Sequence, residues 1–265
     1  MFNFYCIDKI LMKIFRKYKE NTQQHNLYLN LYKNQTIEFA KEKIDKYKML
    51  NNCKLSMKNA LKTMNEFIDP SDPDTELPNL VHAYQTAEAI REKYPENKEF
   101  QICGLIHDVG KILFKFGEPS WWIVGDTFVL GADFPENIVY KNYTYYSDNI
   151  FDKNGIYGEN CGIENLILSY GHDEYLYNVL KQNKTHKLSD KYLNMIRFHS
   201  FYPWHTYGEY KHFMNGQHDE ELLKNVKLLN EFDLYSKYDK DEIPKNVIDY
   251  YDNLLDEIFP EELLW

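Results

Sequence analysis

Apolar residues recur along most of the chain at the three- and four-residue spacing of amphipathic helices. The pattern predicts helices over residues 8–20, 26–49, 56–67, 79–94, 97–116, 162–169, 173–183, 189–199, 219–237 and 245–257. It breaks down over residues 118–160, which are rich in Gly, Asp, Asn and aromatic residues. Within this stretch, residues 127–130 and 137–140 could form short strands. We therefore expect an all-α protein with one irregular, partly β insertion around 118–160.

Helix-terminus signals agree with this pattern. Ser56 and Asn79 precede apolar periodic segments and are predicted N-caps, whereas Pro95 and Gly117 are predicted to end helices. No internal repeat, low-complexity linker or block of like charge marks a domain boundary. The sequence therefore favours a single helical domain.

A histidine and an aspartate stand side by side inside the apolar run 104–111, which the pattern places in a buried helix. Burying His107 and Asp108 costs free energy unless both are paired or bound. A metal ion can take a neutral imidazole nitrogen and a carboxylate oxygen together. The His-Asp pair recurs at 172–173 and 218–219, but these open polar segments where Asp is an ordinary helix-start residue. The pair in the apolar run is therefore the stronger metal candidate.

The other histidines fall into two groups. Those in polar surroundings are expected at the surface: His25, His186, His212 and His218. Those in apolar surroundings, each explicable alone as a hydrogen-bonded core residue, are His82, His107, His172 and His199. Taken with Asp108 and Asp233, the second group supplies imidazoles and carboxylates without a thiolate, which suits iron or manganese better than structural zinc. Six ligands exceed one four-coordinate site, so two metals are favoured, with Asp108 as the natural bridge.

Charge and cysteine content narrow the function classes. The chain carries 31 basic and 41 acidic residues, a net charge of −10, without the basic face that duplex binding requires. Its four cysteines are scattered without a CxxC pair, which argues against a zinc knuckle and a disulfide framework. Charge interrupts the apolar start, and no run approaches the roughly 20 apolar residues of a membrane span. We expect a cytoplasmic protein with neither nucleic acid nor membrane as a partner.

Longer segments resemble the myo-inositol oxygenase family, which belongs to the HD-domain superfamily. They are residues 71–74, 82–88, 104–111, 116–119, 124–128, 171–175, 198–205 and 232–235. The resemblance runs in one order over about residues 15–265, whereas residues 1–14 match poorly. It implies one HD-domain-like all-α domain over 15–265. It also implies an oxidoreductase of inositol catabolism that uses O₂ to open the ring of myo-inositol, giving D-glucuronate and water at a mixed-valent Fe(II)/Fe(III) centre.

The same resemblance implies roles for single residues. The two irons would be held by His82, His107, Asp108, His172, His199 and Asp233, with Asp108 bridging them. Substrate would contact Arg16, Asp69, Pro70, Ser71, Lys111, Gly125, Asp126, His199 and Ser200. Lys111 and Asp108 would act in catalysis. Pro70 departs from the acidic residue that the family pattern leads us to expect. His205 and Asp173 are not expected to be ligands but to support the neighbouring turn and helix.

Lys111 and the overall function each leave an alternative. Lys111 lies three residues after Asp108 and four after His107, on the same predicted helix face. It either extends past the helix end to solvent or holds an anionic substrate oxygen beside a metal. For the whole chain, one alternative is an HD-type metal phosphohydrolase, which would need cations to clamp phosphate. The other is a helical scaffold without catalytic activity.

Overall fold

The computed structural model describes residues 19–71, 77–146, 151–233 and 242–265. Its α-helices are α2 (Gln23–Asn34), α3 (Ile37–Tyr47), α4 (Met57–Thr63), α5 (Asn79–Lys93), α6 (Lys98–Ile106), α7 (Ser120–Ile123), α8 (His172–Gln182), α9 (Asp190–Phe198), α10 (Tyr202–His205), α11 (Gly216–Asp233) and α12 (Lys245–Ile258). The 3₁₀ turns are η1 (Met64–Glu66), η2 (Val109–Phe116), η3 (Lys141–Tyr146), η4 (Ile163–Asn165) and η5 (Lys211–Phe213). One two-stranded antiparallel sheet, β1 (Lys54–Leu55) with β2 (Leu263–Leu264), completes the described part. The predicted all-α class is confirmed.

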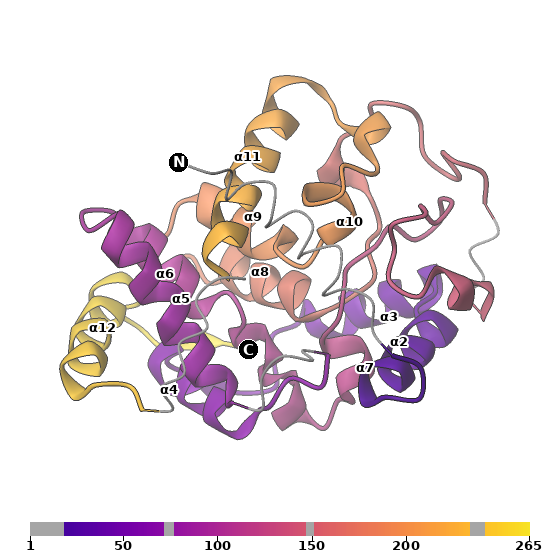
Figure 1. Ribbon diagram of the computed structural model, residues 1–265. Helices are drawn as coiled ribbons and strands as arrows, with labels where there is room; N and C mark the ends of the chain where they lie inside the picture. The colour runs from indigo at the N-terminus through magenta and orange to yellow at the C-terminus, as the bar shows by residue number, and fades with distance from the viewer. Residues whose placement is uncertain (1–18, 72–76, 147–150, 234–241) are drawn as a thin grey trace, which may run out of the picture.

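The helices form three neighbouring groups around a shared core. Helices α5, α6 and α12 lie on one side of the molecule and α2, α3 and α7 on the other, with α8 and α9 between them (Figure 1). Helix α5 packs along α6, α8 packs along α9, and η2 packs against α8. In the described residues, no helix is long and apolar enough to cross a bilayer.

One predicted helix is divided at a local capping group, and two predicted N-caps can be compared with the structure. The predicted helix 26–49 is two helices, because the Thr36 hydroxyl accepts a hydrogen bond from the backbone N–H of Phe39 at 3.1 Å and starts α3. The prediction that Ser56 is an N-cap is confirmed: its hydroxyl accepts a hydrogen bond from the Asn59 N–H at 3.2 Å at the start of α4. The predicted cap at Asn79 is wrong: Pro78 is the cap and Asn79 is the first residue of α5.

The predicted buried helix 97–116 is also wrong as one element. Helix α6 ends at Ile106, and the chain continues after Asp108 as the 3₁₀ turn η2. Gly117, the cap residue that follows η2, has the left-handed conformation (φ 80°). The break therefore falls at the His-Asp pair. The helix predicted over 8–20 lies almost wholly outside the described residues, as does the end of the one predicted over 219–237.

The predicted strand 127–130 forms, but only as an isolated bridge. Val129 pairs antiparallel with Leu168, and the backbone N–H of Leu130 donates to the carbonyl of Ile167 at 2.8 Å. This pairing takes up residues of the helix predicted over 162–169, of which only η4 is helical. Residues 137–140, the second predicted strand, form turns instead.

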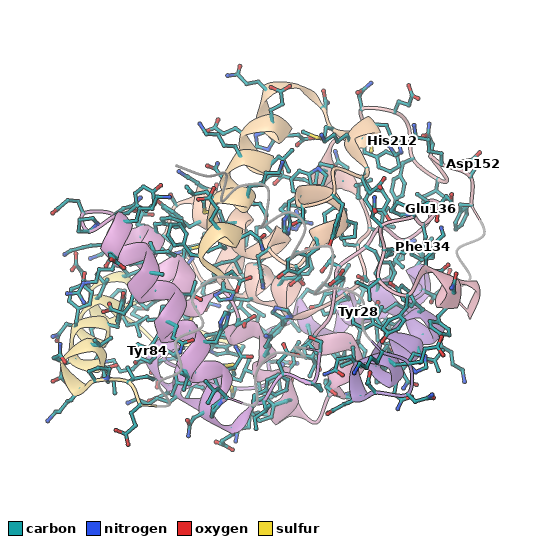
Figure 2. The ribbon with its side chains drawn as sticks, viewed as in Figure 1. Tyr28, Tyr84, Phe134, Glu136, Asp152 and His212 are labelled. Atoms are coloured by element: carbon teal, nitrogen blue, oxygen red, sulfur yellow. The ribbon has the colours of Figure 1, made fainter. Side chains whose placement is uncertain are left out.

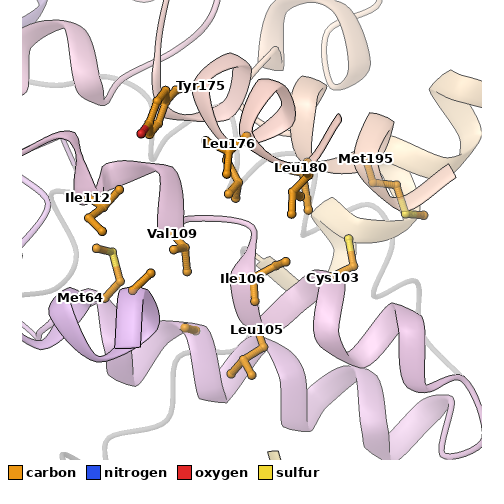
Figure 3. Packing of buried hydrophobic residues seen from close by; sticks show 14 of the residues in the cluster. Met64, Cys103, Leu105, Ile106, Val109, Ile112, Tyr175, Leu176, Leu180 and Met195 are labelled. Atoms are coloured by element: carbon orange, nitrogen blue, oxygen red, sulfur yellow. The ribbon is translucent and has the colours of Figure 1, made fainter. Parts of the chain in front are cut away.

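Apolar side chains pack η2 onto α8 beneath the His-Asp pair. Ile106 and Val109 face Leu176 and Leu180 across this contact (Figure 3). The approach is closest at Gly110, where an added Cβ would lie 1.9 Å from the carbonyl oxygen of His172. A glycine is therefore required for η2 to lie so near the first turn of α8.

Trp265 anchors β2 in the core and should be a major determinant of stability. Its side chain is fully buried, and its indole N–H donates to the carbonyl of Leu55 at 3.0 Å. We expect Trp265→Ala to lower the free energy of unfolding by about 3–5 kcal/mol. Leu264→Ala is the control, because Leu264 directly precedes Trp265 in the chain and is 50% exposed. Urea unfolding of both variants measures the difference, and equal midpoints would contradict it.

Candidate metal centre

Six side chains from five helices converge at the break between α6 and η2. His107 and Asp108 lie at the break itself, and His82 lies in the first turns of α5. The other three lie at helix ends: His172 is the first residue of α8, His199 follows the last residue of α9, and Asp233 is the last residue of α11. The structure thus brings together all six predicted ligands.

The first group of donors surrounds one oxygen of Asp108. Asp233 Oδ1 lies 2.8 Å from His82 Nε2 and 3.2 Å from His107 Nε2. Asp108 Oδ2 lies 3.9 Å and 3.6 Å from the same two nitrogens. Two imidazole nitrogens and two carboxylate oxygens therefore converge within ligand-to-ligand distance.

The second group surrounds the other oxygen of Asp108. Oδ1 lies 3.2 Å from His172 Nε2 and 3.6 Å from His199 Nε2, and the two imidazole nitrogens are 3.1 Å apart. The sets His82–His107–Asp108 and Asp108–His172–His199 each have the geometry to hold a metal ion. Asp108 is shared, and each of its oxygens faces one set.

Backbone carbonyls fix the tautomers of the three buried histidines among the predicted ligands. The Nδ1 atoms of His107, His172 and His199 lie 2.7, 2.6 and 2.7 Å from the carbonyl oxygens of Gly104, Ile123 and Ile196. An Nδ1–H that donates to a carbonyl leaves the Nε2 lone pair facing the centre, the usual arrangement around metal-bound histidine.

The buried polar atoms of the centre fit a metal ion. His107 Nε2 is buried and makes no well-directed hydrogen bond within the described residues. Burial by itself raises the pKa of the Asp108 carboxyl, but Lys111 and His107 outweigh it and hold that pKa well below its usual value. The pKa of Asp233 is likewise held low, against burial, by His107 and His82. Both aspartates are therefore anionic, as metal ligands must be.

Lys111 is buried at the edge of the first group, so of its two alternatives the extension to solvent is wrong. Only 5% of it is exposed. Its Nζ lies 2.7 Å from Asp69 Oδ2 and 2.8 Å from Asp108 Oδ2, and donates to Asn79 Oδ1 at 3.0 Å. Burial by itself lowers the pKa of this ammonium, but Asp108 and Asp69 outweigh it and raise the pKa above its usual value. Lys111 is therefore a buried cation enclosed by oxygen atoms.

The turn 69–71 orients one predicted substrate contact. The backbone N–H and the hydroxyl of Ser71 donate to Asp69 Oδ1 at 2.8 and 2.6 Å, which turns Oδ2 toward Lys111. Pro70 lies between them in the turn. Arg16, the remaining predicted contact from the N-terminal part, lies outside the described residues.

Gly125, Asp126 and Ser200 lie on the side of the second group. Gly125 and Asp126 border a small cavity that His172 also lines. The Ser200 hydroxyl lies 3.3 Å from His199 Nε2. Gly125 adopts φ 101°, a conformation that favours glycine. The predicted substrate contacts in the described residues thus divide between the two halves of the centre.

Two residues near the centre were not predicted. Tyr28, on α2 (Figure 2), donates its hydroxyl to Asp126 Oδ1 at 3.0 Å. No sequence signal links residues 98 positions apart. Asn79 contacts both Lys111 and Asp108, and its position three residues before His82 on α5 was a usable signal.

The remaining histidines lie outside both groups. His205 Nε2 is 2.8 Å from the carbonyl oxygen of His199, consistent with the supporting position expected of it. Asp173, the other residue not expected to be a ligand, also lies outside both groups. Its carboxylate accepts hydrogen bonds from the Thr127 hydroxyl and the Glu174 N–H. His212 lies at the periphery (Figure 2). The surface position expected for His25 is wrong, because it is buried against Tyr140 and Tyr143.

An all-α fold that buries two His/Asp groups around a shared carboxylate defines a class, that of helical proteins able to hold metal ions. Comparison with known proteins narrows it. The family model described as myo-inositol oxygenase matches residues 21–265. The chain is 42% identical over 249 residues to inositol oxygenase of Danio rerio, covering 91% of this chain and 88% of that protein. It is 44% identical over 264 residues to inositol oxygenase of Dictyostelium discoideum (95% and 89%), and 40% over 263 residues to a probable inositol oxygenase of Oryza sativa subsp. japonica (95% and 85%).

The chain belongs to the myo-inositol oxygenase family. It is therefore an enzyme, an oxygenase of the oxidoreductase class.

Proposed function

We propose that this protein opens the ring of myo-inositol with O₂ to give D-glucuronate and water, using two iron ions. The reaction removes four electrons from the substrate, so O₂ is fully reduced and no external reductant is consumed. The observation that carries the proposal is the shared Asp108, whose two oxygens face two separate histidine groups. Buried, anionic and central, it has the position of a bridge.

In this proposal His82, His107 and Asp233 hold one iron and His172 and His199 the other, with Asp108 binding both. The irons, mixed-valent at rest, would supply the redox chemistry with O₂. The second group offers fewer protein donors than the first, so it leaves more positions open to substrate. Asp126 and Ser200, which we propose contact the substrate, lie on that side.

The protein side chains orient the polyol and balance charge. Asp126, held by the Tyr28 hydroxyl, would accept hydrogen bonds from inositol hydroxyls. Lys111 would donate to a substrate oxygen and favour its anionic form. All three donors of its ammonium now face oxygens. We expect the donor aimed at Asp108 to turn to the substrate, because a metal competes for that carboxylate.

The two alternatives are less well supported. A phosphohydrolase needs cations free to clamp phosphate, whereas Lys111 is already enclosed by three oxygens, two of them anionic. A scaffold without catalytic activity gives no reason to keep two aspartates buried and anionic. A single domain over residues 15–265, a cytoplasmic location and the lack of a nucleic-acid partner remain predictions.

Purified protein tests the proposal directly. We expect about two irons per chain, an electron-spin signal that changes when inositol is added, and one D-glucuronate formed per O₂ consumed. Inositol-independent oxygen uptake, or hydrolysis of phosphate esters without oxygen uptake, would contradict it.

Lys111→Met should separate a catalytic from a structural role for the ammonium. Loss of a charged donor in a closed site typically lowers kcat/KM by about 30- to 1,000-fold. Lys111→Arg should not restore it, since a planar guanidinium cannot occupy the ammonium position. Lys115→Met is the control, because Lys115 lies on the same η2 and pairs with Glu66 near the surface. Near-normal oxygen uptake by iron-replete Lys111→Met would refute the contact.

A further inference from the structure

Asn79 lies between the bridging carboxylate and the buried ammonium. It is 4% exposed at the start of α5. Its Nδ2 donates to Asp108 Oδ2 at 2.6 Å, and its Oδ1 accepts from Lys111 Nζ at 3.0 Å. The NH₂ group and the oxygen of one neutral amide thus bind Asp108 and Lys111, the two residues to which we assign catalytic roles.

The charges around Asn79 allow only one orientation of its amide. In the reverse orientation, the NH₂ group would face the Lys111 ammonium and the oxygen would face the Asp108 carboxylate, two repulsive contacts. The side chain does not cap α5, because Pro78 is the cap residue. Its backbone N–H is held by the carbonyl of Phe67 at 2.8 Å. The amide is therefore fixed from both sides and turned inward.

The three oxygens around Lys111 differ in what else they bind. Asp108 would be shared with metal, and Asp69 belongs to the turn 69–71 that we expect to meet the substrate. Asn79 has neither task. It also lies three residues before His82, on the same face of α5, so one helical turn carries a proposed ligand and this amide.

We propose that Asn79 is a positioning residue: it holds the Lys111 ammonium in a fixed place beside the bridging carboxylate, so that the ammonium meets the substrate oxygen. The inference rests on the proposed function. It assigns the amide no direct contact with substrate. Its loss should therefore impair inositol binding and turnover while the metal ligands stay in place.

Asn79→Leu, which keeps the volume but removes both polar ends, tests this. Asn79→Ser is the second variant, for use if Asn79→Leu folds poorly. The serine hydroxyl is too short to reach both partners but is polar and can be hydrated. We expect about two irons per chain in each, and inositol binding weakened roughly 5- to 30-fold when titrated through the electron-spin signal. The kcat of the iron-replete variants should fall as well.

Gln101→Leu is the matched control. Gln101 is another buried amide, whose NH₂ donates to the carbonyls of Tyr94 and Pro95 and whose oxygen accepts from the Tyr250 hydroxyl. It should lower the melting temperature without changing inositol affinity. If the Asn79 variants behave like Gln101→Leu, the amide is structural and the inference fails. If they lose iron, Asn79 builds the metal site and the inference also fails. If the unmodified protein binds no inositol, the proposed function fails first and the inference falls with it.

Discussion

If Asp108 bridges two irons as we propose, Asp108→Ala should abolish oxygen uptake and lower the iron content of the protein. Each oxygen of Asp108 faces one histidine group, so this substitution removes a donor from both groups, whereas His172→Ala removes one from the second group alone. We expect inositol-dependent turnover to fall at least about 1,000-fold, since both the metal and its charge balance are disturbed. Iron analysis and oxygen uptake on the purified variant measure the effect.

Asp173→Asn is the control for Asp108→Ala. Asp173 is also buried and also follows a histidine, but its carboxylate binds the Thr127 hydroxyl and the Glu174 N–H. It should retain both irons. Asp108 would not be the bridge if Asp108→Ala still held two irons per chain. The same would follow if Asp108→Ala lost less iron than His172→Ala.

Gly110→Ala should lower the stability strongly although it adds only one methyl group. The new methyl group would lie 1.9 Å from the carbonyl oxygen of His172 and 3.0 Å from Leu176 Cβ. The first of these is backbone, so η2 and α8 must separate. We expect a loss of about 3 kcal/mol or more in the free energy of unfolding. Displacement of His172 should also lower the iron content.

Gly158→Ala is the matched control, because nothing lies within 4 Å of a Cβ built there. It should unfold at nearly the same urea concentration as the unmodified protein. A Gly110→Ala variant as stable as Gly158→Ala would mean that η2 and α8 are not packed as described.

The helices could be predicted where residues close in sequence determine where they begin and end. Helices α8, α9 and α12 follow the apolar periodicity closely, and Ser56 caps α4 as expected. The break after α6 could not be predicted, since it depends on how closely Gly110 approaches a helix more than sixty residues away. Residues 162–169 fail for the same reason, because pairing with 127–130 overrides their helical pattern.

The site was more predictable than the fold in its members and less so in its arrangement. Buried histidines and aspartates are costly without a partner, so apolar sequence context together with the family resemblance singled out the six that converge. Their division into two groups depends on the direction in which each oxygen of Asp108 points, and that is a tertiary property. The burial of Lys111 likewise depends on Asp69 from a distant turn.

The placement of donors at the ends of α6, α8, α9 and α11 has a consequence for the lifetime of the protein. Helix ends fray first, so an ion that ties several of them together opposes the openings at which proteases cut. A ligand that binds only the native state, present at 100 times its dissociation constant, stabilises it by about 2.7 kcal/mol. If the centre holds iron and the protein breaks down inositol, as we propose, cells short of iron should lose the protein itself as well as its activity.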